Sequence, residues 1–90
     1  MHNEMLETMI EDSEIRNQKP EPGQKVILIG LPEGFVGDLP EDDQRAITAM
    51  IGRPITLNGY EEDGRVELEF TDDQGVIHMI FVDPRFIGSL

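Results

Sequence analysis

Hydrophobic and polar residues alternate strictly along residues 65–71, and two further stretches of strand length lie at residues 55–60 and 76–82. Strict alternation predicts a strand with one buried face and one face in solvent. The polar, glycine-containing stretches 62–64 and 72–75 separate the three runs, and such stretches are typical of hairpin turns. We therefore expect a three-stranded antiparallel meander over residues 55–82.

Other patterns predict one more strand and two short helical segments. Residues 25–29 contain four consecutive apolar residues, which predicts a strand covered on both faces. Residues 39–51 carry Pro40 and three acidic side chains near their start and continue with an apolar stripe at helical spacing. This order indicates a short helix that ends at Gly52. Pro84 ends the last strand, and residues 85–87 are expected to form a single helical turn.

Residues 1–18 have a weaker, helical pattern. Their apolar stripe is narrow and consists of Met5, Leu6, Met9 and Ile10. Because an isolated helix of this length is marginal in water, we expect this segment to be either helical against another surface or disordered. Two prolines and a glycine within residues 19–23 indicate a linker. We therefore divide the chain into an N-terminal segment with its linker, 1–22, and a domain, 23–90.

The order of the predicted elements is similar to that of SH3-like small barrels. The resemblance is carried by the Asp-Gly turn and strand of residues 63–70, the strand of residues 75–82 and the closing turn of residues 83–87. Tudor-like and KOW-like small barrels, and some small bacterial proteins, have a similar hairpin. The resemblance implies a mainly β fold with short helices, an SH3-like small barrel preceded by the helical or disordered segment. It implies no function, because one tyrosine and no tryptophan are too few for a polyproline groove or an aromatic cage.

The charge of the chain is strongly negative. Its 90 residues include seven Lys and Arg against nineteen Asp and Glu, which gives a net charge of −12. The basic residues are scattered, so binding to nucleic acid or to an anionic membrane surface is not expected. A basic protein partner is one interpretation of this charge, and simple solubility is another.

The composition also limits the chemistry that the chain can perform. The absence of cysteine excludes disulfides, cysteine zinc sites and cysteine nucleophiles. No apolar run approaches the roughly 18 residues of a membrane-spanning helix, and the N-terminus lacks a signal-peptide pattern, so we expect a cytoplasmic protein. His2 and His78 are too few for a dependable zinc site, and the acidic turns lack the spaced ligands of a calcium loop. We expect neither a metal nor another cofactor.

The predicted strand register gathers one group of side chains on the solvent-facing side of the meander. With Asp73 and Gln74 as a two-residue turn, Phe70 lies opposite Ile77 on the buried face, and Glu69 lies opposite His78 on the other. In the same register Glu67 lies opposite Ile80, Asn58 lies beside Glu69, and Tyr60 lies beside Glu67. Val76, Ile80 and Val82 would share this face, which is more apolar than a solvated face requires. The predicted partner-binding residues are Tyr60, Glu67, Glu69, His78, Ile80, Val82, Met5 and Met9.

Three functions compete on these grounds. The first is a protein–protein interaction or regulatory module that docks an unknown protein, or a second copy of itself, through the sheet face or a loop. The second is an acidic mimic of nucleic acid that inhibits a basic protein, which the net charge of −12 suggests. The third is a small hydrolase-like enzyme in which Glu69 orients His78 as a general base, although such a pair is more often an ordinary cross-strand contact. We favour the interaction module, because catalysis requires a concave pocket rather than a flat sheet.

Overall fold

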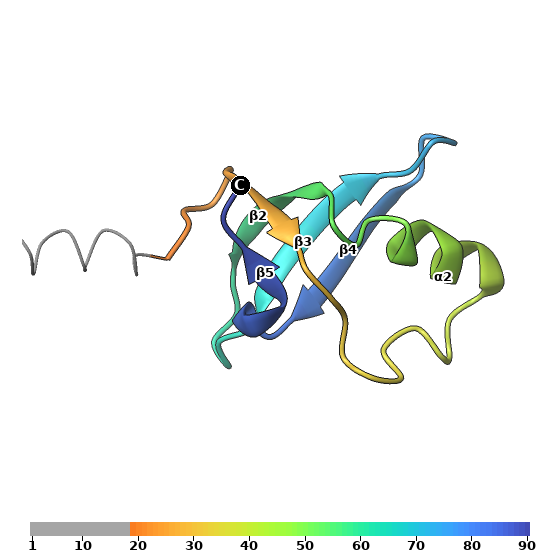
Figure 1. Ribbon diagram of the computed structural model, residues 1–90, viewed down its shortest axis with the longest axis horizontal. Coiled ribbons are helices and arrows are strands. Elements are labelled where there is room, and N and C mark those ends of the chain that lie inside the picture. Colours follow the sequence, from red (N-terminus) through yellow and green to blue (C-terminus); the bar gives the residue numbers. More distant parts are fainter. Residues whose placement is uncertain (1–18) are drawn as a thin grey trace, which may run out of the picture.

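The computed structural model describes residues 19–90. The predicted N-terminal segment, including Met5 and Met9, lies outside these residues. The described part is mainly β with one short α-helix, as the sequence predicts (Figure 1). Its elements are β1 (Lys25–Leu28), α2 (Glu41–Thr48), β2 (Pro54–Tyr60), β3 (Val66–Thr71), β4 (Ile77–Val82), the 3-10 helix η1 (Pro84–Phe86) and β5 (Ile87–Gly88).

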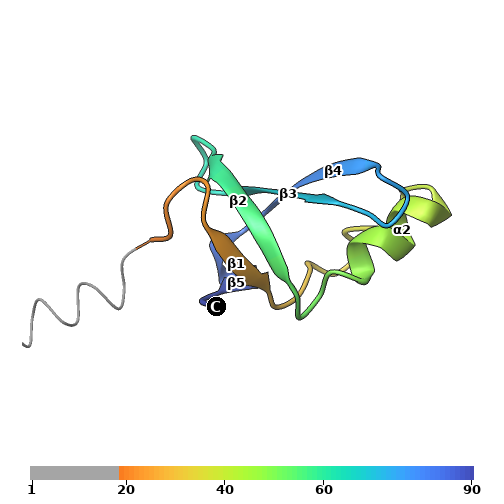
Figure 2. The same ribbon diagram turned by 90° about the horizontal axis from the view of Figure 1, so that it is seen from above.

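The five strands form one antiparallel sheet in the order β4-β3-β2-β1-β5. The sheet bends along β2, so that β3 and β4 lie on one side of the bend and β1 and β5 on the other (Figure 2). This arrangement is consistent with a small β-barrel-like fold. The sheet does not close, because β4 and β5 are its two edges within residues 19–90.

The hydrophobic core lies on the inner face of the bent sheet. Leu28, Leu57 and Leu68 have no solvent exposure, and Ile47 of α2 is buried with them. The predicted buried face of β3 is confirmed, because its alternation of buried and partly exposed residues follows the sequence pattern. The prediction that residues 25–29 are covered on both faces is wrong, because burial alternates along β1, and Ile29, just after the strand, is 55% exposed.

The turn between β3 and β4 has three residues rather than the two that we predicted. The Asp72 amide donates a hydrogen bond to the Val76 carbonyl at 2.9 Å, so residues 73–75 form the loop. Gly75 at its end has a φ of 83°, the left-handed conformation that completes a three-residue hairpin loop. The third loop residue moves the pairing of β4 by one position.

This shift reverses the two faces of β4, because side chains on neighbouring positions of a strand point to opposite sides. Phe70 pairs with His78, and Leu68 pairs with Ile80. Ile80 and Val82 are therefore buried in the core, at 5% and 1% exposure. The prediction that these two residues lie on the solvent-facing side is wrong.

Candidate functional site

The outer face of β4 carries three apolar side chains, which we call the outer stripe: Ile77, Met79 and Phe81. Ile77 is 61% exposed and Met79 is 57% exposed. Phe81 is half-buried, and the Arg65 guanidinium lies over its ring at 5.4 Å. These three residues carry the exposed apolar character that the sequence pattern assigned to Ile80 and Val82.

The backbone of the same three residues faces the free edge of the sheet. In an antiparallel pair, positions that exchange hydrogen bonds alternate with positions that do not. The Asp72–Val76 bond fixes this alternation, so His78, Ile80 and Val82 bond to β3. The N–H and C=O groups of the outer stripe therefore point away from β3, where no described residue pairs with β4.

This edge lacks the usual protection of an exposed strand. Edge strands commonly carry charged residues, proline or bulges that prevent pairing with another chain, whereas β4 has the sequence IHMIFV. A groove of about 530 Å³ lies beside β4, with Phe35, Leu39, Asp43 and Ile47 among its lining residues. The free edge and the groove together leave space for another chain.

Two acidic side chains lie next to the outer stripe on β3. Glu69 pairs with Met79, and Glu67 pairs with Phe81. The Asn58 amide donates to Glu69 Oε1 at 2.8 Å and to Glu67 Oε2 at 3.1 Å, so the expected contact between Asn58 and Glu69 is confirmed. The outer face thus carries the outer stripe on its edge strand, β4, and the negative charges of Glu67 and Glu69 on the neighbouring strand, β3.

Tyr60 lies on the core side of the sheet and not beside Glu67. It pairs with Val66, and its hydroxyl donates to the Pro20 carbonyl at 2.8 Å. The Lys19 ammonium lies 5.3 Å from its ring centroid, and burial raises the pKa of the Tyr60 hydroxyl. The difference arises because the β2–β3 turn has three residues, 62–64, and not the predicted two. The Glu61 amide donates to the Arg65 carbonyl at 2.8 Å, which moves the pairing of Tyr60 by one position.

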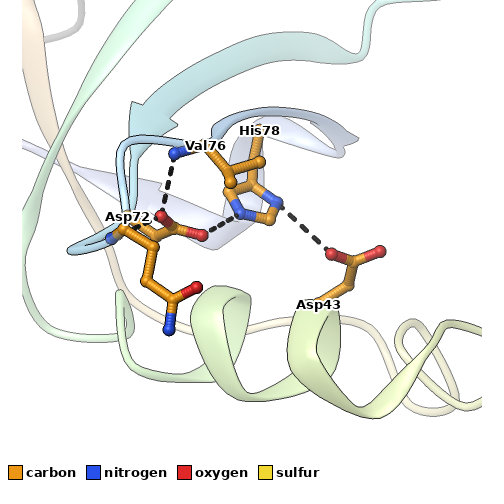
Figure 3. Close-up of polar contacts among 5 residues, drawn as sticks. Asp43, Asp72, Val76 and His78 are labelled. Carbon is orange, nitrogen blue, oxygen red and sulfur yellow. Dashed lines mark hydrogen bonds and ion pairs between the residues drawn. The ribbon is translucent and has the colours of Figure 1, made fainter.

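His78 also faces the core side, where it joins the β3–β4 turn to α2 (Figure 3). Its ring stacks on Phe70 with the centroids 4.8 Å apart. Nε2 lies 2.8 Å from Asp72 Oδ2, and Nδ1 lies 4.0 Å from Asp43 Oδ1. The predicted pairing of His78 with Glu69 is wrong, because Glu69 faces the opposite side of the sheet.

The carboxylate of Asp72 holds both the turn and the histidine. Its Oδ1 accepts hydrogen bonds from the amides of Gln74 and Val76, each at 2.9 Å. The hydrogen bond with His78, followed by the Val76 amide, lowers the pKa of Asp72. Within residues 19–90 no group of three His, Cys, Asp or Glu side chains could hold a metal ion. The hydrogen bonds of this cluster therefore indicate a structural role, in which Asp72 fixes the turn and orients the ring of His78.

The predicted partner-binding residues are thus divided between two faces. Glu67 and Glu69 lie on the outer face, while Tyr60, His78, Ile80 and Val82 lie on the inner one. The sequence interpretation missed the outer stripe. The signal that could have found it is Gly75, because a glycine at the third loop position is typical of a three-residue hairpin turn.

The chain matches no protein-family model, and no curated protein or solved structure matches it. Within residues 19–90, every helix is too short or too polar to cross a bilayer.

Proposed function

We propose that this protein is a protein–protein interaction module that docks its partner through the β4 edge. One observation carries the proposal: the outer stripe presents both its side chains and its outward-facing backbone groups at an edge that no strand within residues 19–90 pairs with. Addition of a strand to an exposed sheet edge is a common mode of peptide recognition. Backbone hydrogen bonds supply affinity in this mode, and alternate side chains supply specificity.

The apolar side chains supply the driving force for docking. Full burial of a side chain of this size is worth about 1.5–3 kcal/mol. Because Ile77 and Met79 are each more than half exposed, covering them contributes on the order of 1 kcal/mol each. The unpaired N–H and C=O groups of three residues add hydrogen bonds, each worth about 1 kcal/mol net.

We further propose that the sheet is an SH3-like small barrel and that the protein acts in the cytoplasm. The strand order and the 3-10 helix before β5 support the barrel, and the lack of cysteine favours a reducing compartment. The enzyme hypothesis required Glu69 beside His78, and these two side chains lie on opposite faces of the sheet. The nucleic-acid mimic rests on the net charge alone.

Site-specific photo-cross-linking in living cells tests docking at β4. A photoreactive phenylalanine analogue is placed at Ile77, and a matched probe is placed at Ile29, which is 55% exposed on the β1 side of the sheet. We expect a discrete adduct from position 77 that position 29 does not give. Equal labelling at both positions, or no adduct at position 77, would contradict docking at β4.

A further inference from the structure

We propose that the partner at this edge is a second copy of the chain, whose β4 pairs antiparallel with β4 around a two-fold axis at Met79. The inference rests on the proposed docking function and adds the identity of the partner and the register. In this register Met79 lies opposite Met79 of the second copy. Ile77 lies opposite Phe81 of the second copy, and the reverse pair repeats across the axis.

The outer stripe is complementary to itself in this arrangement. A two-fold interface uses the same patch on both copies. The side chains and backbone groups of the edge must therefore be complementary to those of the same edge. Ile77, Met79 and Phe81 are the three β4 positions whose backbone groups face outward, and they are symmetric about Met79. Every outward-facing position therefore meets an outward-facing position, and every pair on the outer face is apolar.

The charges at the ends of β4 do not add to this attraction. Arg65 lies over Phe81 at one end, but it already pairs with Asp63 at 2.8 Å, and the exposed Asp83 follows the strand at the same end. The exposed Asp73 lies in the turn at the other end. The antiparallel orientation therefore rests on the symmetric placement of the three outward-facing residues and not on charge.

The net charge of −12 opposes association, but the acids beside the stripe lie far apart in the dimer. Glu69 is one strand away from Met79, so the two copies of Glu69 are separated by three strand spacings, about 14 Å. This exceeds the screening length of about 8 Å at physiological ionic strength. Repulsion therefore weakens the dimer only at low salt, and added salt should strengthen it, whereas a basic partner would be released by salt.

The other edge of the sheet is a poorer place for a second copy. β5 consists of Ile87–Gly88 and offers two residues for pairing, while β4 offers six. A dimer or ring that joins β4 to β5 would form fewer backbone hydrogen bonds. Pairing of β4 with itself uses the full length of the longer edge on both sides.

Single-cysteine cross-linking of the full chain tests the register, because the chain contains no cysteine of its own. In the proposed dimer, Met79→Cys places two thiols at a Cα separation of about 5.5 Å, within the range of a disulfide. Ile77→Cys places them roughly 14 Å apart, four residues along the strand. We expect a covalent dimer from Met79→Cys, none from Ile77→Cys, and a mixed dimer when Ile77→Cys is combined with Phe81→Cys. Cross-linking of Ile77→Cys as fast as that of Met79→Cys would overturn the register.

Light scattering after size-exclusion chromatography tests the partner itself. The wild-type chain should be a dimer whose dissociation decreases as sodium chloride is raised. Met79→Lys should be monomeric, and the matched control Ile29→Lys should remain a dimer. Circular dichroism distinguishes loss of the dimer from loss of the fold, and an unfolded Met79→Lys is replaced in the comparison by Met79→Glu.

A wild-type chain that stays monomeric up to high concentration, without a Met79→Cys cross-link, would overturn the second copy as partner. The photo-cross-linking experiment at position 77 then tests independently whether any partner docks at β4. An adduct with a different protein would uphold docking at β4 while refuting the dimer. No adduct would refute both.

Discussion

The Asp72 carboxylate joins three parts of the molecule through a few atoms. It accepts hydrogen bonds from two backbone amides of its own turn and contacts His78 of β4. The other side of the His78 ring faces Asp43 of α2. The side chain of His78 is only 9% exposed between these two acids. A single charge in this position therefore supports both the turn geometry and the orientation of the ring.

Replacement of this charge should weaken the fold in a pH-dependent way. The lowered pKa of Asp72 means that the folded state favours the ionised carboxylate, so its contribution is present above the unfolded value of 3.8. The contribution is lost as the pH falls through the lower folded value. We expect Asp72→Asn to unfold at a lower temperature than wild type at pH 7, with the difference shrinking below pH 4.

Thermal unfolding followed by circular dichroism from pH 2 to pH 7 measures this effect. Asp73→Asn is the matched control, because it removes the same charge from the neighbouring exposed position. Its unfolding temperature should stay closer to that of wild type. If the unfolding temperatures of Asp72→Asn and wild type differ by the same amount across the whole pH range, the charge of Asp72 is not the cause of the lost stability.

The β3–β4 hairpin shows how a turn of three residues determines which side of a strand is buried. His78, Ile80 and Val82 face inward because Gly75 takes the left-handed conformation and adds one residue to the loop. The strand bounds could be predicted from apolar runs, and those of β2, β3 and β4 agree with the sequence to within one residue. The facing of β4 could not be predicted from its own composition, because apolar residues occupy both of its faces.

Alanine substitutions on the two faces of β4 test this register directly. Ile80 is 5% exposed, so Ile80→Ala should lower the free energy of unfolding by about 2–5 kcal/mol through lost burial and a cavity. Ile77→Ala on the outer face should lower it by less than about 1 kcal/mol. Urea unfolding at low protein concentration measures both. The reverse order of the two effects would support the register with a two-residue turn.

Gly75 itself provides a second test of the hairpin. A β-carbon at this position meets no atom within 4 Å, so any loss of stability in Gly75→Ala comes from the left-handed backbone. We expect a decrease of about 1–2 kcal/mol in the free energy of unfolding. Gly59→Ala is the control, since its β-carbon also meets open space and its φ is not in the left-handed region. Equal effects of the two substitutions in urea unfolding would contradict the role of Gly75.

Residues 19–90 form an open, bent sheet whose inner face is buried and whose β4 edge pairs with no other strand of this part of the chain. The mainly β class could be predicted from the alternation in β3 and from the glycine turns. The two-residue strand β5 was missed, because Ile87–Gly88 is too short to produce a pattern. The docking edge could not be predicted either, since it depends on which strands end the sheet and not on local sequence.

Net charge acts on the molecule as a whole. An excess of twelve negative charges makes the chain repel itself. The repulsion is stronger in the compact folded state than in the expanded unfolded chain, so it lowers the stability of the fold. Salt screens this repulsion, because the Debye length falls from about 30 Å at 0.01 M to about 3 Å at 1 M. We therefore expect the urea midpoint of unfolding to rise with sodium chloride at pH 7. Urea rather than guanidinium chloride is required, since guanidinium chloride is itself a salt.

Self-association would also raise this midpoint, so the salt series needs a monomeric reference. Met79→Lys should show the same upward trend as wild type if self-repulsion within one chain is the cause, because it changes the net charge from −12 by only one charge. In wild type, a further increase that depends on protein concentration reports the dimer. A midpoint that does not change with salt in Met79→Lys would show that the acids are too widely spread to repel one another. The negative charge would then matter for solubility and for partners but not for folding.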